Sequence, residues 1–407
     1  MEINKFNVKK ILDSAEQLSP KIIALRRHFH KNPELGFKEF KTNNRICEEL
    51  NKLSVFKLNN SIAGTGITGL LKPDNASNNS RVVGLRADMD ALPLQEDNKL
   101  SYKSKNDGIM HACGHDGHMA MLLGALMILG EYREEFTGNV KFIFQPAEEH
   151  YGGARDMIKG GALAEPKLDG IFGLHQMPTL DFGKIAVSPG PVMAGGGGFM
   201  IRVEGAGCHA AYPWKGIDLV SAVADLCLKL QSIHNRISAL ENIVLALTSI
   251  KSSEDAFNII PNAITIKGTL RTFSSETRET ILKEITKILK GFDLAYGTKS
   301  KFELFEGYPP TVNDPDLAEI IKTTAEMLGY PCQDMVKEMG SEDFAYYQQQ
   351  TKGGYFILGV GDAKHQAALH NPGFDFDDSV LVRGAAMLAM CAINFLNQDT
   401  NVKDLED

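Results

Sequence analysis

Residues 81–88, with the sequence Arg81-Val-Val-Gly-Leu-Arg-Ala-Asp88, form a short apolar run that ends on a carboxylate. Three later runs have the same character, at residues 139–149, 169–175 and 353–361. A helical pattern over residues 118–132 separates the first two of these four runs. Short buried runs that alternate with helices are typical of an α/β fold. We therefore predict a mixed, largely parallel sheet, with functional residues at the carboxyl ends of its strands.

The segment from residue 187 to residue 308 has a different order of predicted strands and helices. It contains, in order, a strand, an amphipathic helix, two strands, a second helix and a last strand. This β-α-β-β-α-β order is that of a ferredoxin-like unit. We predict that residues 187–308 form a small domain inserted into a larger, discontinuous domain of residues 1–186 and 309–407. The glycine run Gly195–Gly198 lies at the entry to this insert, where a hinge is expected.

The composition limits the function classes. The 407 residues carry a net charge of −8, so no nucleic-acid partner is expected. The longest apolar run, Met119–Leu129, is too short to span a bilayer, so no membrane partner is expected either. The N-terminal segment lacks the apolar core of a secretion signal. Six scattered cysteines without a CxxC pair favour a reducing compartment, and we expect a cytoplasmic protein.

The densest group of reactive side chains is His111-Ala-Cys113-Gly-His115-Asp116-Gly-His118. A cysteine and a histidine separated by one glycine can face the same metal ion from a tight loop. Thiolate and imidazole are good ligands for zinc-like ions. Taken alone, the segment fits equally well a buried free cysteine with helix-capping neighbours.

A second group, Gln145-Pro-Ala-Glu148-Glu149, follows the apolar run that begins at residue 139. Because successive side chains diverge, one carboxylate could bind a metal while the other takes a proton from a bound water. On its own, the pair is more typical of a solvated loop.

Four further residues give weaker signals. His175 and His370 could each be an ordinary core or loop histidine. Asp88 and Asp90 could be a carboxylate that orients a metal ligand and a turn former, respectively. Taken together, all these groups supply a cysteine, at least three histidines and two glutamates at strand ends. Such a set fits a two-metal hydrolase.

These motifs occur in the order found in one known family. The chain resembles the dinuclear metallopeptidase family that includes aminoacylases and glutamate carboxypeptidases. Within it, the chain is most similar to the amidohydrolase subgroup of hippurate hydrolases, N-acetylamino-acid deacetylases and auxin-conjugate hydrolases. The resemblance covers nearly the whole chain and is carried by residues 27–36, 85–93, 111–118, 145–149, 173–175, 260–262, 268–273, 340–344 and 369–372.

The resemblance implies a role for each matching residue. It makes Glu148 the general base and acid, and it places Asp88 in the catalytic site without a direct bond to metal. It implies substrate contacts, some of them across a dimer, for His209, Asn262 and Arg271. It also implies two divalent metal ions per subunit, zinc or manganese, with cobalt or nickel as alternatives. The implied metal ligands are Cys113, His115, Glu149, His175 and His370.

The reaction implied by the resemblance is hydrolysis of the amide bond of an N-acyl amino acid with an acetyl, benzoyl or indole-acetyl group. The insert is implied to be a lid and dimerisation domain, which gives a homodimer or a higher homo-oligomer. One alternative is a metallo-dipeptidase or carboxypeptidase of the same family. Two others are a thiol hydrolase with Cys113 as nucleophile and a non-catalytic metal-binding protein.

Three positions depart from the family pattern. Arg86 stands where the wider family has a metal-binding histidine, so His115 is expected to supply that imidazole. Cys208 replaces the second glycine of a Gly-Gly-His motif. Trp214, the only tryptophan, stands where a histidine is frequent. The sequence leaves open whether Trp214 lines an acyl pocket or is a surface or interface aromatic.

Overall fold

The computed structural model describes residues 8–53, 55–73 and 80–397, and the chain forms two compact units. Unit 1 contains Met1–Gly190, Val312–Val336 and Tyr346–Asp407. Unit 2 contains Pro191–Thr311 and Lys337–Ala345. The prediction of one continuous insert did not include this last segment.

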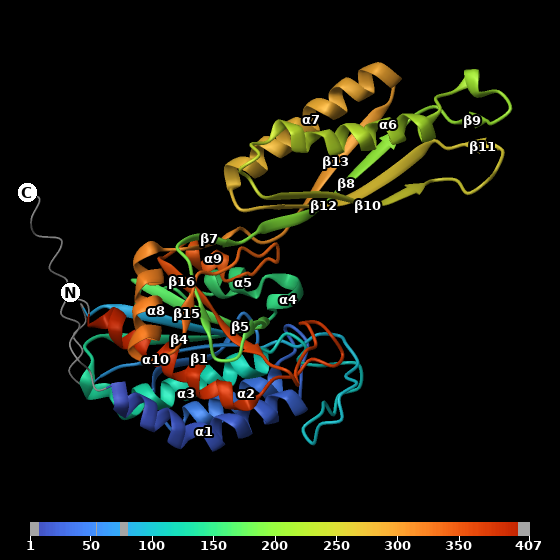
Figure 1. The fold of residues 1–407 in the computed structure, drawn as a ribbon. Helices are drawn as coiled ribbons and strands as arrows, with labels where there is room; N and C mark the ends of the chain where they lie inside the picture. Colours follow the sequence, from blue (N-terminus) through green and yellow to red (C-terminus); the bar gives the residue numbers. More distant parts are fainter. Residues whose placement is uncertain (1–7, 54, 74–79, 398–407) are drawn as a thin grey trace, which may run out of the picture. The chain divides into compact units, whose positions relative to one another are not determined.

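Unit 1 is built on an eight-stranded sheet with the order β1-β2-β4-β3-β5-β16-β6-β15 (Figure 1). Strands β4, β3, β5 and β16 run parallel to one another, whereas β1 pairs antiparallel with β2, β2 with β4 and β16 with β6. This arrangement confirms the predicted mixed α/β fold class. The strands are β1 (Val55–Ile62), β2 (Gly66–Leu71), β3 (Val82–Asp88), β4 (Asn139–Gln145), β5 (Gly170–Asp181), β6 (Ile185–Ala186), β15 (Cys332–Gln333) and β16 (Gly353–Gly361).

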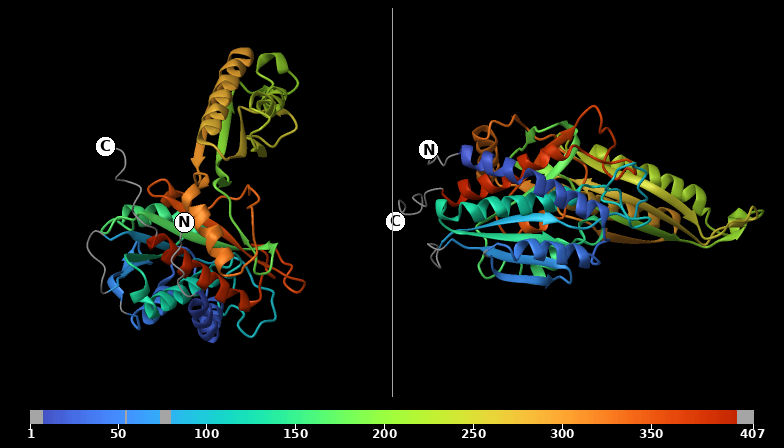
Figure 2. Two further views of the ribbon diagram at one scale, coloured as in Figure 1. Left: turned by 60° about the vertical axis from the view of Figure 1, so that its left-hand side comes forward. Right: turned by 90° about the horizontal axis from the view of Figure 1, so that it is seen from below.

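Three long helices, α1 (Val8–Lys31), α3 (His115–Glu131) and α10 (Leu381–Leu396), lie together on one side of this sheet (Figures 1 and 2). Helix α3 is buried from His115 to Leu129. The segment Asp378–Leu396 is long and apolar enough to cross a membrane, but 78% of it is buried in the protein, as in a core helix. The other helices of unit 1 are α2 (Phe40–Leu50), α4 (Glu148–Tyr151), α5 (Gly153–Lys159) and α8 (Pro315–Met327), and α9 (Ala345–Gln348) begins where the chain returns to it.

Two element boundaries differ from the prediction in ways that matter for the site. Helix α3 begins three residues before the predicted start, so His115 lies in its first turn. Strand β5 does not end at His175, as was expected, but continues to Asp181. Only its first seven residues are buried. The predicted end was too early because the apolar pattern of the sequence stops where the strand leaves the core.

Unit 2 contains a four-stranded antiparallel sheet with the order β10-β12-β8-β13. Two helices pack on it, and Asp218 and Ser274 cap them by accepting backbone N–H groups. The chain order is β8 (Gly195–Glu204), α6 (Leu219–Gln231), β10 (Ile243–Ser252), β12 (Ala263–Thr272), α7 (Ser275–Tyr296) and β13 (Lys299–Glu306). Short strands are β9 (Cys208–His209) and β11 (Ile259–Ile260), which pair, and β7 (Gly190–Met193) and β14 (Thr311–Asn313) at the connections.

The run Gly195–Gly198 forms the start of β8, where Gly196 pairs with Arg271 of β12. A Cβ atom at Gly196 would lie 2.4 Å from Cδ of Arg271. The absent side chain therefore leaves room for the arginine to lie across the strand. The four glycines belong to a paired strand, and the lack of a side chain at Gly196 is explained by packing within unit 2.

Candidate metal centre

The loop Cys113-Gly114-His115 enters α3 through a left-handed glycine. Gly114 has φ of 90°, a conformation that L side chains rarely adopt. A Cβ atom at this position would lie 1.6 Å from Nε2 of Gln176, which donates a hydrogen bond to the Gly114 carbonyl at 2.7 Å. The glycine between the two candidate ligands is therefore required by both backbone conformation and packing.

The thiol of Cys113 lies between two histidines from distant parts of the chain. Its Sγ atom is 3.3 Å from Nε2 of His175 on β5 and 3.4 Å from Nε2 of His370. Glu149 completes this side, with Oε1 3.2 Å from Nε2 of His370 and 3.9 Å from Nε2 of His115. The structure thus brings together all five side chains that the sequence suggested as metal ligands.

Glu148 belongs to the same cluster. Its carboxylate, that of Glu149 and the His115 ring offer ligand atoms within 4.8 Å of one another. The Glu148 side chain is buried, with 7% of the residue exposed. The solvated loop considered from the sequence is therefore not what the structure has at this position.

The histidines are oriented as metal ligands would be. Nδ1 of His115 donates to the Asp90 carbonyl at 2.9 Å, and Nδ1 of His175 donates to the Gln176 carbonyl at 2.6 Å. Each ring therefore directs its other nitrogen, Nε2, toward the cluster, where it can bind a metal ion once it carries no proton. Among the residues that the structure describes, Nε2 of His115 has no hydrogen-bond partner. This orphaned buried nitrogen, beside a thiol and carboxylates, fits a zinc-like divalent ion.

The electrostatics of Cys113 bear on the thiol-hydrolase alternative. Burial, together with the charges of Glu149, Glu148 and Asp88, raises the pKa of the Cys113 thiol well above its usual value. A nucleophilic cysteine needs the opposite, a lowered pKa in an electropositive environment. The site stabilises a thiolate only when cations are present, which favours Cys113 as a ligand.

Asp88, at the end of β3, links Arg86 and His118. Nη1 of Arg86 donates to Asp88 Oδ2 at 2.6 Å, and Nδ1 of His118 donates to Asp88 Oδ1 at 2.6 Å. Burial alone would raise the pKa of Asp88, but His115, Arg86 and His118 hold it well below its usual value. His118 also accepts a hydrogen bond from the Gln176 amide at 3.3 Å, so both of its ring nitrogens are engaged within the protein.

Arg86 therefore does not act as a ligand where the wider family has a histidine. Besides Asp88, its Nε donates to Oε1 of Gln145 at 2.9 Å. The guanidinium balances the Asp88 charge and fixes the end of β3 against the end of β4.

The Glu148–Glu149 pair is held by two acids whose roles the sequence reasoning missed. Asp90, suggested as a turn former, accepts the amides of Glu148 and Glu149 with its two oxygens, both at 3.0 Å. The preceding Ala147 has a left-handed φ of 55°, and its amide donates to Oε1 of Glu39 at 3.0 Å. The position of Asp90 in a matching motif was a usable signal. No feature of the sequence pointed to Glu39.

The three suggested substrate residues lie in unit 2 and do not form one group there. His209 is on β9, and Oδ1 of Asn262 accepts the Gly207 amide at 3.1 Å, just before β9. Arg271 is at the other end of the ten-residue strand β12, so it lies about 30 Å from Asn262. Its Nη1 donates to Oγ1 of Thr269 at 2.6 Å.

The departures at positions 208 and 214 lie close to His209. The Cys208 thiol is half-buried, with Sγ 4.0 Å from the Pro213 carbonyl. Trp214 is 74% exposed and contacts the Tyr212 ring edge-to-face at 5.7 Å. Within unit 2, Trp214 therefore lies on the surface.

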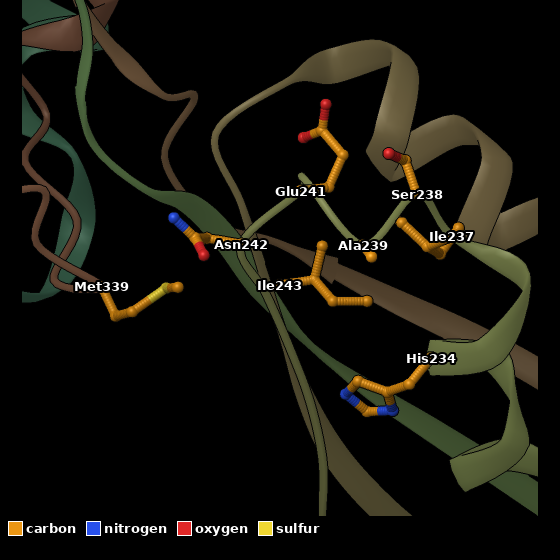
Figure 3. Close-up of a pocket in the computed structure, with 8 residues that line it drawn as sticks. All are labelled: His234, Ile237, Ser238, Ala239, Glu241, Asn242, Ile243 and Met339. Atoms are coloured by element: carbon orange, nitrogen blue, oxygen red, sulfur yellow. The ribbon is translucent and has the colours of Figure 1, made fainter.

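A pocket of about 220 Å³ is found elsewhere in unit 2 (Figure 3). Its walls come from residues between His234 and Ile243 and from Met339. None of the suggested site residues lines it, so it is separate from the metal-ligand cluster.

Known proteins are similar to this chain in sequence and in fold. Residues 84–394 match the peptidase family M20/M25/M40. An N-acetylcysteine deacetylase of Bacillus subtilis is 35% identical over 92% of this chain and 96% of its own length. A hippurate hydrolase of Campylobacter jejuni is 36% identical over 91% of this chain and 96% of its own length. A Bacillus subtilis structure described as a dinuclear metal-binding peptidase has a TM-score of 0.83 and 32% identity, covering 94% and 99% of the two chains.

Proposed function

The chain belongs to the peptidase family M20/M25/M40, and we propose that it is a metal-dependent amidohydrolase that cleaves N-acyl amino acids. One observation carries this proposal: Cys113 and four other candidate ligands lie together, and a second acid, Glu148, lies beside them. A closed structural site uses about four ligands and leaves no acid to spare. The named activities of relatives over more than 90% of the chain support the choice of substrate class.

Cys113, His115, Glu149, His175 and His370 would hold two divalent ions, zinc or manganese. Ions bound there supply positive charge that lowers the pKa of a water molecule and stabilises a developing oxyanion. The thiol of Cys113 would lose its proton on metal binding, because a cation reverses the effect of the surrounding carboxylates.

Glu148 accepts the proton of the attacking water and then delivers it to the departing amine. Its position is suited to this role, because Asp90 and Glu39 fix the short helix on which it lies. Asp88 contributes by holding His118 and Arg86, and its charge lies 3.8 Å from Nδ1 of His115.

Substrate selection is assigned to unit 2. Arg271 would bind the free carboxylate of the amino acid, and Asn262 and His209 would contact the rest of the substrate. Because Asn262 and Arg271 lie at opposite ends of β12, these residues contact one substrate most readily if two chains contribute. This geometry supports a homodimer or a higher homo-oligomer, with unit 2 as its interface and lid.

A cytoplasmic location completes the proposal. All six cysteines fall in the described part of the chain, and each is a free thiol. Free thiols in both units suit a reducing compartment.

The decisive experiment measures metal content and turnover of N-acetyl, benzoyl and indole-acetyl amino acids before and after chelation. We expect about two ions per chain, loss of activity on chelation and recovery with zinc or manganese. Activity that survives complete metal removal would refute the proposal. Hydrolysis of dipeptides in preference to every N-acyl amino acid would reassign the substrate to the dipeptidase class.

A further inference from the structure

Arg26 lies at the centre of a buried ionic network that the proposed reaction does not use. It is on α1 and is fully buried. Its Nε donates to Asp116 at 2.8 Å, Nη2 to Asp375 at 2.7 Å and Nη1 to Asp378 at 2.9 Å. The Phe376 ring covers the guanidinium, with its centroid 4.2 Å from Cζ. Each nitrogen of the fork therefore has its own carboxylate, an arrangement that a guanidinium can make and an ammonium cannot.

The three aspartates belong to two segments that carry candidate metal ligands. Asp116 directly follows His115 in the first turn of α3. The other two lie five and eight residues after His370. The two segments also meet directly, because the His370 amide donates to the Ala112 carbonyl at 2.8 Å. Arg26 thus connects the two stretches of chain whose ligands converge on the thiol.

The charges in this network depend on one another. Nδ1 of His30 lies 2.8 Å from Oδ2 of Asp116, and its Nε2 lies 3.2 Å from Oε1 of Glu96. Without the guanidinium, the three carboxylates would lose their shared counter-charge, which would leave Asp116 with His30 and Asp378 with Arg27, and they would move apart. Movement of Asp116 would reach His115 through one peptide bond.

We propose that Arg26 is a positioning residue for the metal centre. It fixes the start of α3 against residues 370–378, so that ligands on both segments bind the same ions. This inference rests on the proposed function, because it requires a metal centre at Cys113. Arg26 acts through the aspartates. Mutation of a residue that orients metal ligands in this way typically weakens metal binding by about 10–100-fold.

The test compares Arg26→Lys with Arg383→Lys. Arg383 is the control: its guanidinium also contacts aromatic rings, those of Phe182 and Tyr330, and its Nη1 donates to the Gly183 carbonyl. Zinc affinity is measured on metal-free protein by competition with a chromophoric chelator, alongside the melting temperature and the kcat and KM of the loaded enzyme. We expect Arg26→Lys to weaken zinc binding at least about tenfold and to lower kcat with KM nearly unchanged.

The outcomes are separable. Unchanged zinc affinity and kcat in a folded Arg26→Lys variant would overturn the inference, whatever its melting temperature. An equal loss in Arg383→Lys would also overturn it. If Arg26→Lys does not fold, Asp375→Asn, which keeps the shape and removes one arm, must weaken zinc binding for the inference to stand. Failure of the wild type to bind zinc or hydrolyse substrate would instead refute the proposed function.

Discussion

The candidate residues of unit 1 and unit 2 are held in different ways. In unit 1, side chains from α4, β5, α3 and the C-terminal segment converge on one buried thiol and direct their ligand atoms toward it. In unit 2, His209 and Asn262 are exposed and Arg271 is half-buried, at two ends of a sheet. Groups that break bonds need a fixed position, whereas groups that bind a substrate must let it enter and leave. We therefore expect mutations in unit 1 to change kcat or metal binding, and mutations of the three candidate residues of unit 2 to change KM.

The largest effect is expected for Glu148→Gln, which keeps the shape of the side chain and removes its basicity. We expect kcat to fall by about 10³–10⁴-fold, since proton transfer by a positioned group contributes on this scale. KM and metal content should be nearly unchanged. The exposed Glu319→Gln on α8 is the control and should behave as wild type. Retention of most turnover in Glu148→Gln would refute the assignment of the base.

Two histidines five residues apart allow a test of whether the side chains around Cys113 bind metal. His370 reaches the Cys113 thiol, whereas His365 contacts Asp362 at 2.7 Å in the same segment. We expect His370→Ala to weaken binding of at least one metal ion by more than about a hundredfold, because a ligand is removed outright. His365→Ala should retain the wild-type metal content. Equal metal content in both variants, measured by elemental analysis, would contradict the ligand set.

Glu39, which accepts the amide before the Glu148 helix, should make the free energy of unfolding depend on pH. Burial chiefly raises the pKa of Glu39 from 4.5 to about 7. The folded state therefore binds this proton more tightly than the unfolded state, and the associated stability is lost as pH rises from about 4.5 to 7. We expect the wild type to lose about 3 kcal/mol relative to Glu39→Gln over this range. Denaturant unfolding of the metal-free proteins at several pH values measures this, and a constant difference would refute it.

The smallest effect is expected in unit 2. Arg271→Ala should raise KM about tenfold while kcat changes little, because a carboxylate contact made before and during the reaction is lost. Arg202→Ala on the neighbouring strand β8 removes an exposed ion pair with Glu204 and is the control. A fall in kcat with KM unchanged would mean that Arg271 takes part in the chemistry, and the separation of the two units would no longer hold.

Local patterns were enough to predict the strand-and-helix order and to single out the candidate residues, whereas the choice of the five ligands came from the resemblance to the family. Strand ends, the Cys113-Gly-His115 spacing and the acid pair are all visible in short stretches of sequence. The supporting contacts were not predictable, because they join residues far apart in the chain. Arg26 and Asp378 are separated by 352 positions, and Glu39 and Ala147 by 108. No local pattern encodes such a partner.

The place of β16 in the main sheet has a consequence for biosynthesis. It lies between β5 and β6, although it is one of the last elements to leave the ribosome. Until residue 353 has emerged, β5 has an open, apolar edge with unpaired backbone groups. Most of unit 2 is contiguous and can fold earlier during translation. We expect nascent chains that stop before Gly353 to recruit chaperones or aggregate, and chains released with β16 and α10 to become protease-resistant.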